Sequence, residues 1–162
     1  MLKKNILVLI IFFLISIIFS CHKNKKDAEL AMISQYLEDH NITEEPLADG
    51  LYFIQTEFST TSTDKSVYPH EGDTVIIMYQ GYLLSDTNVV FDRKTIDNPA
   101  HYVYLTDKVI SGWEESVGMM KKDAPVLLII PSDLAYKGKQ TGIIPPYSTL
   151  IFDARILDIK KP

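Results

Sequence analysis

The pattern of hydrophobic and polar residues predicts a mostly β domain in the C-terminal part of the chain. Between residues 73 and 84, Val75 and Ile77 fall on one face of an extended strand, and Ile76 and Met78 on the other. Both faces of this strand are therefore expected to be at least partly covered. Shorter runs predict further strands at Leu51–Phe58, Val89–Phe91, His101–Leu105, Val126–Ile130 and Thr149–Ile159.

One short helix is predicted among these strands. Ser111 and Glu114 have the spacing of a capping box, in which a serine hydroxyl and a glutamate three residues later satisfy free backbone N–H groups. The helix is expected to run from Ser111 to about Met120 and to place Trp113 against the concave side of the sheet. A mostly antiparallel sheet with one helix against one face is an α+β fold.

A second, amphipathic helix is predicted ahead of this domain. Leu30, Ile33 and Leu37 form one apolar stripe at helical spacing, Asp27 is able to cap the start, and Asn41 lies close to the end. Such a helix can dock on the main domain, serve as a stalk element or mediate dimerisation.

Two stretches are predicted to be irregular. Residues 42–50 contain Pro46 and Gly50, which favour a linker. The Ser- and Thr-rich run Ser59–Ser66 is expected to be an exposed loop.

The first twenty residues are predicted to be a targeting segment outside the fold. Lys3 and Lys4 precede an uninterrupted apolar run, Ile6–Phe19, and Ser20 and Cys21 follow it, which is the layout of a secretory signal. A membrane-spanning helix needs about 20 apolar residues, so the run is short for that role. A signal is therefore the better interpretation.

Cys21 is the only cysteine, so an intramolecular disulfide is excluded. Its position after Ile18, Phe19 and Ser20 resembles a bacterial lipobox, although Phe19 is bulkier than the small residue usual there. We therefore expect lipidation of Cys21 with cleavage just before it; an uncleaved N-terminal anchor is the alternative. Either arrangement would tether the domain to a membrane.

The charge balance argues against nucleic acid as a partner. The whole chain has a net charge of −5, and removal of Lys3 and Lys4 with the signal makes it −7. An acidic surface repels phosphate backbones. The one basic cluster, Lys23, Lys25 and Lys26, lies beside the proposed anchor, where it would face anionic lipid head groups or solvate the tether.

Metal and hydrolase chemistry have no support in the sequence. The histidines lack the spacing of metal ligands. No strand–turn–helix nucleophile motif or phosphate-binding loop is present. No cofactor or metal is therefore expected. The four histidines are His22, His40, His70 and His101.

Several short segments between about Glu71 and Ile159 are informative when taken together. They are Gly72-Asp73-Thr74-Val75, Tyr79-Gln80-Gly81, Phe91-Asp92, Val109-Ile110-Ser111-Gly112-Trp113-Glu114-Glu115, Ala135-Tyr136, Gly142-Ile143-Ile144-Pro145-Pro146 and Thr149-Leu150-Ile151-Phe152-Asp153. In this order and spacing they resemble the FKBP-type peptidyl-prolyl cis-trans isomerases. The resemblance implies an antiparallel half-barrel sheet wrapped around one short helix, with an apolar pocket between them.

The predicted organisation follows from these segments and from the N-terminal patterns. Residues 1–20 are the lipoprotein signal peptide. Residues 21–50 form a tether, a short amphipathic helix and a linker. Residues 51–162 form the FKBP-type domain, with its core at 71–159.

The resemblance also implies roles for individual residues. Trp113 would form the pocket floor, the Ile110 N–H would bind a substrate carbonyl, Tyr136 would contribute a phenolic hydrogen bond, and Asp92 would be a polar group at the rim. The implied catalytic residues are Asp92, Tyr136, Ile110, Trp113 and Phe152. The implied substrate-binding residues are Tyr79, Phe91, Val109, Ile143 and Ile144. The alternative is that these aromatic residues are only core.

The implied reaction explains why neither nucleophile nor metal is needed. Rotation of an Xaa–Pro bond breaks amide resonance over a barrier of about 18–20 kcal/mol without changing any covalent bond. The planar amide is dipolar and the twisted transition state is less so. A dry aromatic pocket therefore disfavours the ground state relative to the transition state.

Some positions depart from the family pattern. Lys137 follows Tyr136 where a glycine is common, and it would either stay in solvent or attract acidic residues next to the substrate proline. The loop from Lys137 to Thr141 is slightly short. The register near His101 leaves open whether Tyr102 or Tyr104 reaches the pocket rim.

The sequence thus predicts a lipid-anchored bacterial envelope protein that isomerises Xaa–Pro bonds of exported proteins. The outer membrane, facing the periplasm, is preferred over the inner. The expected partners are proline-containing protein or peptide clients and the membrane, with no nucleic acid. The alternatives are a non-catalytic FKBP-like module that binds clients in an envelope complex, and a small-ligand receptor lipoprotein, which would need a deeper pocket.

Overall fold

The computed structural model describes residues 25–56 and 68–162. The chain divides into two compact units, one ending at His40 and the other running from Asn41 to Pro162. The predicted signal of residues 1–20, Cys21 and the loop Ser59–Ser66 lie outside the described residues. Within the described ranges, no helix has the length and apolar character needed to cross a membrane.

The first unit contains the predicted N-terminal helix, which covers residues 25–39. Asp27 lies inside this helix, so its expected role as the N-terminal cap is wrong. Asn41 follows the end of the helix with φ 54, the left-handed conformation that commonly terminates helices.

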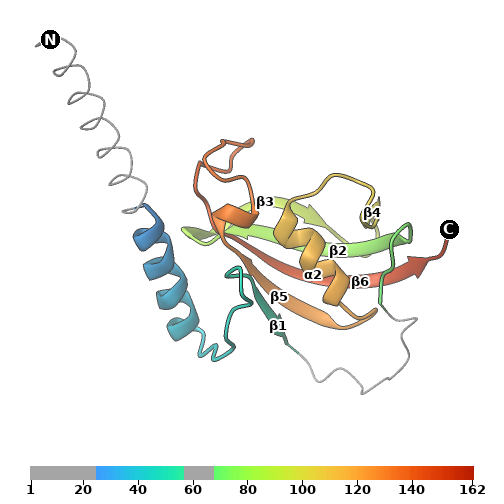
Figure 1. Cartoon of the computed structure of the whole chain (residues 1–162), viewed down its shortest axis with the longest axis horizontal. Coiled ribbons are helices and arrows are strands. Elements are labelled where there is room, and N and C mark those ends of the chain that lie inside the picture. The colour runs from blue at the N-terminus through green and yellow to red at the C-terminus, as the bar shows by residue number, and fades with distance from the viewer. Residues whose placement is uncertain (1–24, 57–67) are drawn as a thin grey trace, which may run out of the picture. The chain divides into compact units, whose positions relative to one another are not determined.

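The second unit is built on one antiparallel sheet of six strands (Figure 1). The strand order is β1-β5-β6-β2-β3, and β4 also pairs with β2. The strands are β1 (Tyr52–Gln55), β2 (Thr74–Leu83), β3 (Asp86–Lys94), β4 (Ala100–Val103), β5 (Pro125–Ile130) and β6 (Leu150–Lys160). Strand β2 is central because β3, β4 and β6 all pair with it.

Alternation along the strands separates the two faces of the sheet. Val75 and Ile77 of β2 are fully buried in the main core, as are Leu128 of β5 and Ile156 of β6. Ile76, on the opposite face of β2, is only 9% exposed. The expectation that both faces of this strand are covered is therefore confirmed.

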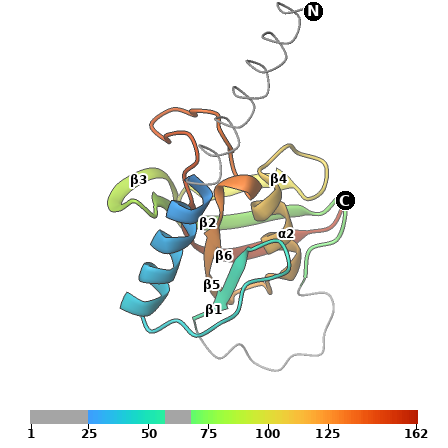
Figure 2. The same ribbon diagram turned by 60° about the vertical axis from the view of Figure 1, so that its left-hand side comes forward.

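Helix α2 (Ser111–Met119) lies against one face of the sheet (Figures 1 and 2). Its Trp113 and Val117 are buried in the main core. A Cβ atom on Gly112 would come within 2.5 Å of the Ile130 side chain, so glycine permits the close approach of α2 to β5. The predicted α+β half-barrel with an N-terminal helical extension is confirmed.

The start of α2 differs from the prediction. Ile110 is the N-cap residue, with no side-chain hydrogen bond at the cap, so the predicted capping box is wrong. The Ser111 hydroxyl donates instead to the carbonyl oxygen of Leu134, at 3.2 Å. Leu134 ends the short 3-10 helix η2 (Ser132–Leu134), so this bond joins the start of α2 to the segment after β5.

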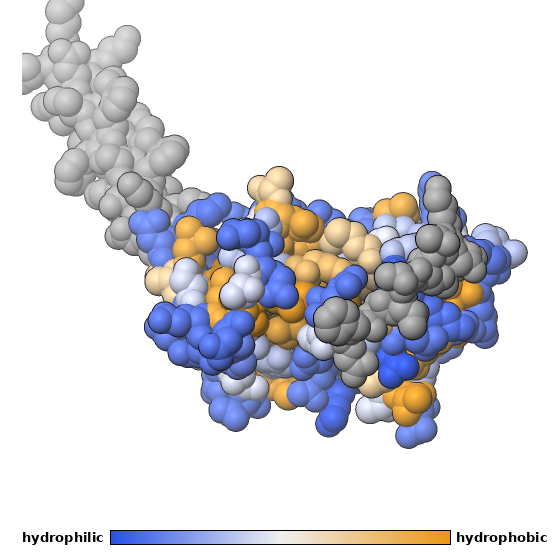
Figure 3. All heavy atoms as spheres, turned by 90° about the horizontal axis from the view of Figure 1, so that it is seen from below, coloured by the Kyte–Doolittle hydropathy of each residue, from blue (hydrophilic) through white to orange (hydrophobic). Residues whose placement is uncertain are grey.

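Hydrophobic residues on the face seen in Figure 3 gather in patches between hydrophilic ones. Among the described residues, the large apolar side chains with substantial exposure include Ile96, at 67%, and Ile143, at 61%. Both lie outside the regular strands and helices.

Candidate active site

A cavity of about 200 Å³ lies where α2 begins against the sheet. Strands β2, β3 and β6 each contribute an aromatic side chain, and the start of α2 contributes the indole of Trp113. The lining residues are Tyr79, Phe91, Asp92, Lys108, Val109, Ile110, Trp113, Tyr136 and Phe152.

The register of the sheet brings the aromatic residues together. Gly81 of β2 pairs with Phe152 of β6 on one side and with Asp92 of β3 on the other. A Cβ atom on Gly81 would lie 2.6 Å from the Phe91 ring and 2.8 Å from the Phe152 ring. The absence of a side chain at this position therefore lets the two rings meet over β2.

The rings pack edge to face or tilted. The Trp113 and Phe152 centroids are 4.8 Å apart, Tyr79 and Trp113 5.0 Å, and Phe91 and Phe152 5.4 Å. Such pairs contribute about 0.5–1.5 kcal/mol each beyond the area they bury. Trp113 and Phe152 are each only 6% exposed, so the apolar wall of the cavity is held in place by the core behind it.

The cavity also carries a fixed carboxylate. The Tyr79 hydroxyl donates to Asp92 Oδ2 at 2.5 Å, and the Arg93 backbone N–H donates to Asp92 Oδ1 at 2.8 Å. Burial raises the pKa of the Tyr79 hydroxyl, and the hydrogen bond to Asp92 raises it further. The hydroxyl therefore remains a donor at neutral pH and holds Asp92 in one orientation.

Two further donors line the cavity. Ile110 precedes α2 in an extended conformation, and its carbonyl oxygen accepts hydrogen bonds from the N–H groups of Trp113 and Glu114. Its own N–H bonds to no acceptor within the described residues, nor does the hydroxyl of Tyr136. Both groups are thus available to hydrogen-bond a bound peptide.

The structure brings most of the predicted site residues together. All five predicted catalytic residues line the cavity, as do Tyr79, Phe91 and Val109 of the predicted substrate-binding set. Two members of that set do not line it: Ile143 is 61% exposed, and Ile144 is 5% exposed and belongs to the core.

Lys108 lines the cavity but was not predicted. The only feature of the sequence that could have indicated Lys108 as a lining residue is its position directly before Val109, in the segment that leads into α2. Neither Tyr102 nor Tyr104 lines the cavity; both pack against the core instead. In the described part of the chain, no group of three or more His, Cys, Asp or Glu residues could hold a metal ion.

Fold and cavity together define a class of protein: an open antiparallel sheet packed on a short helix, with an aromatic cavity between them. Comparison with known proteins gives the family. The family model described as FKBP-type peptidyl-prolyl cis-trans isomerase matches residues 65–157, more than half of the chain. The chain belongs to this family.

Curated relatives share about a third of the aligned residues. The FKBP-type peptidyl-prolyl cis-trans isomerase FkpA of Escherichia coli K12 is 35% identical over 107 residues, which are 64% of this chain and 37% of that protein. The chain thus spans well under half the length of this relative. Peptidyl-prolyl cis-trans isomerase Fkbp12 of Drosophila melanogaster is 35% identical over 99 residues, which cover 60% of this chain and 90% of that protein.

Two crystal structures are similar to most of the chain. FkpA from Escherichia coli aligns with a TM-score of 0.66 and 32% identity, covering 86% of this chain and 62% of that one. A peptidyl-prolyl cis-trans isomerase from Pseudomonas syringae aligns with a TM-score of 0.67 and 25% identity, covering 86% and 96%.

Proposed function

We propose that this protein catalyses the cis-trans isomerisation of Xaa–Pro peptide bonds. The observation that carries the proposal is the cavity of about 200 Å³, in which five aromatic side chains, four of them packed ring on ring, converge with the carboxylate of Asp92 and two unbonded donors. Family membership supports the same activity.

The apolar wall accounts for the acceleration. A planar Xaa–Pro amide is stabilised by charge separation, which the twisted transition state loses. An amide that lies against Trp113 and Phe152 loses its hydration. This loss destabilises the dipolar planar state more than the less polar twisted state, so the barrier between them falls. Each 1.4 kcal/mol of this difference gives about a tenfold increase in rate.

The polar groups hold the substrate in place. The Ile110 N–H binds a substrate carbonyl oxygen and fixes the peptide while the bond beside the proline rotates. The Tyr136 hydroxyl is a second donor for the twisting amide. Asp92, held by Tyr79, provides a fixed negative charge at the rim. No proton or covalent bond changes place, so these residues act only through their positions and their charges.

The N-terminal sequence supports a cellular location for the protein and a class of client. The apolar run Ile6–Phe19 and the following Cys21 support export and lipid anchoring of the protein at a bacterial membrane, facing the periplasm. Exported proteins that are still folding would then be the clients, since unfolded chains carry the largest share of cis Xaa–Pro bonds.

The test uses the full chain in detergent micelles and a short Leu-Pro peptide whose isomerisation is followed optically. Phe152→Ala should lower kcat/KM about 10–100-fold, because burial of an aromatic wall contributes about 1.5–3 kcal/mol. Phe53→Ala is the matched control, since Phe53 packs on the core but does not line the cavity.

Three results would contradict the proposal. One is a wild-type rate equal to that of the uncatalysed peptide while thermal unfolding shows a folded protein. Another is an equal loss of activity in the Phe152→Ala and Phe53→Ala variants. Binding of the peptide without acceleration would instead support the non-catalytic client-binding module.

A further inference from the structure

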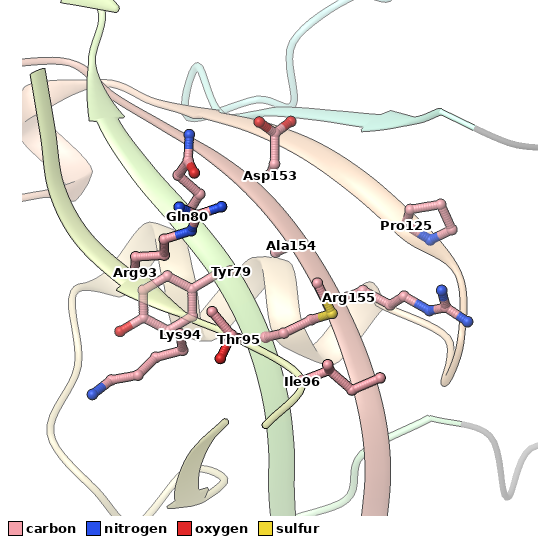
Figure 4. Close-up of a pocket in the computed structure, with 11 residues that line it drawn as sticks. Tyr79, Gln80, Arg93, Lys94, Thr95, Ile96, Pro125, Asp153, Ala154 and Arg155 are labelled. Carbon is pink, nitrogen blue, oxygen red and sulfur yellow. The ribbon is translucent and has the colours of Figure 1, made fainter. Parts of the chain in front are cut away.

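A second hollow lies on the face of the sheet opposite α2. Its volume is about 500 Å³, larger than that of the aromatic cavity. In Figure 4, α2 lies behind strands β2 and β6, and Arg93 and Arg155 extend from opposite sides of this strand pair. We call this hollow the outer groove.

The outer groove is built from two adjacent rows of side chains across the sheet. In the first row, Pro125 of β5 pairs with Arg155 of β6, which pairs with Met78 of β2. The second row joins β6, β2 and β3 and consists of Asp153, Gln80 and Arg93. All six positions line the groove.

Positive charge is concentrated here although the protein is acidic overall. The chain has a net charge of −5, yet Arg93, Lys94 and Arg155 line the groove against the single acid Asp153. Burial raises the pKa of Asp153, an effect that a hydrogen bond from the Tyr82 hydroxyl opposes. Three cationic side chains against one carboxylate give the groove its positive character.

The two guanidinium groups are available to a ligand. The Arg93 side chain makes no hydrogen bond or ion pair within the described residues. Arg155 approaches Asp123 at 3.7 Å, with the two side chains 46% and 60% exposed. Exposed pairs at such distances contribute little to stability, so an incoming carboxylate can replace Asp123.

The remaining lining is suited to a polypeptide. Met78, Ile96 and Pro125 present apolar surface, and the Gln80 amide can both donate and accept hydrogen bonds as a peptide backbone requires. Arginine binds carboxylates through two parallel hydrogen bonds. We propose that the outer groove binds an acidic polypeptide segment, with its carboxylates on Arg93 and Arg155 and its apolar side chains on Met78 and Ile96.

The experiment measures binding of a fluorescein-labelled, proline-free peptide, in which glutamate alternates with leucine, to the full chain in detergent micelles. Fluorescence anisotropy should show saturable binding that weakens severalfold between about 50 and 300 mM salt. Arg93→Gln and Arg155→Gln should each weaken binding about tenfold, because each removes one charge-assisted pair.

Three controls define the specificity. Lys139→Gln makes the same charge change outside the groove lining and should leave the affinity within about twofold of wild type. A peptide with glutamine in place of every glutamate should bind at least about tenfold more weakly. Phe152→Ala, which alters the aromatic cavity, should leave binding unchanged. Thermal unfolding of each variant checks that it is folded.

The proposal is overturned by any of four results. These are no anisotropy change at about 1 mM protein, equal weakening by Lys139→Gln, equal binding of the glutamine peptide, and release of the acidic peptide by Phe152→Ala alone. Vesicles containing phosphatidylglycerol provide a further arm. Capture of the protein by these vesicles through Arg93 and Arg155, without peptide binding, would assign the groove to lipid and overturn the proposal.

Discussion

Gly81→Ala tests whether the aromatic cavity depends on a missing side chain in β2. The new Cβ atom would lie 2.6 Å from Phe91 Cζ and 2.8 Å from Phe152 Cε1. The φ angle of Gly81 is not positive, so alanine fits the strand backbone itself. Any effect of the substitution must therefore come from movement of the two rings.

The size of the effect follows from these distances. Carbon atoms in contact are at least about 3.4–3.5 Å apart, so the Phe91 ring must retreat by about 0.8 Å and the Phe152 ring by about 0.6 Å. Overpacking of this kind costs about 1–3 kcal/mol of stability. A displacement of about 1 Å in a binding site can lower activity about 100-fold, so we expect kcat/KM to fall 10–100-fold.

The assay compares Gly81→Ala with Ile77→Val in the Leu-Pro isomerisation measurement. Ile77 is fully buried on the same face of the same strand but does not line the cavity. Its truncation should cost about 0.5–1.5 kcal/mol in urea unfolding and leave kcat/KM nearly unchanged. The reasoning is refuted if Gly81→Ala keeps wild-type kcat/KM, or if Ile77→Val loses as much activity.

Three further substitutions test other contacts. Tyr79→Phe removes the hydrogen bond that holds Asp92 and should lower kcat/KM about 3–10-fold. Because burial raises the pKa of Tyr79, the kcat/KM of the wild type should not change with pH up to about pH 10. Rate measurements of the two proteins across this pH range check both expectations. Asp73 is buried, which alone would raise its pKa, but hydrogen bonds from Lys161 and the His70 N–H hold the pKa below 3.8. The ion pair between Asp73 and Lys161 therefore stabilises the fold at pH values above 3.8. This stabilisation is lost as the pH falls through the lower pKa that Asp73 has in the folded protein. Asp73→Asn should cost about 1–3 kcal/mol at pH 7, and the difference from wild type should shrink as the pH falls below 3.8 in urea titrations. Ser111→Ala should cost less than about 1 kcal/mol in thermal unfolding, because Ser111 does not cap α2.

The strands could be predicted because their apolar residues alternate, but their ends could not. Only Val89–Phe91 of β3 is apolar enough to be noticed, yet β3 extends from Asp86 to Lys94. The added residues are polar and mostly exposed, and backbone hydrogen bonds to β2 hold them in the strand. Hydrophobic pattern reports side-chain burial and carries no information on such backbone pairing.

The cap of α2 shows how a tertiary contact overrides a local pattern. Ser111 and Glu114 have capping-box spacing, and in isolation the serine hydroxyl would accept from a backbone N–H of the first turn. In the fold, the carbonyl oxygen of Leu134 lies within reach, and the hydroxyl donates to it. Leu134 is 23 residues away in the sequence, so no local rule could have predicted this partner.

The predicted site residues that lie in strands line the cavity, whereas Ile143 and Ile144 of the loop after Tyr136 do not. Ile143 and Ile144 are adjacent and equally apolar, but a bridge between Thr141 and Ile144 turns the chain so that Ile144 enters the core and Ile143 faces outward. Loop residues have no periodicity from which such directions could be read.

The outer groove could not be predicted from the sequence, because the resemblance to a family does not show which face of the sheet each residue of a matching segment occupies. Tyr79 and Gln80 stand in one family-like segment, and Phe152 and Asp153 in another, yet each pair is divided between the two faces of the sheet. Tyr79 and Phe152 line the aromatic cavity, whereas Gln80 and Asp153 line only the groove, which Tyr79 also borders. Only the register of β2 against β6 separates the two sets, since a shift of one residue would exchange them. The same strand segments can therefore hold the proposed proline site on one face and the proposed acidic-peptide site on the other. Substitutions at Phe152 should affect the cavity, and substitutions at Gln80 or Asp153 the groove, independently.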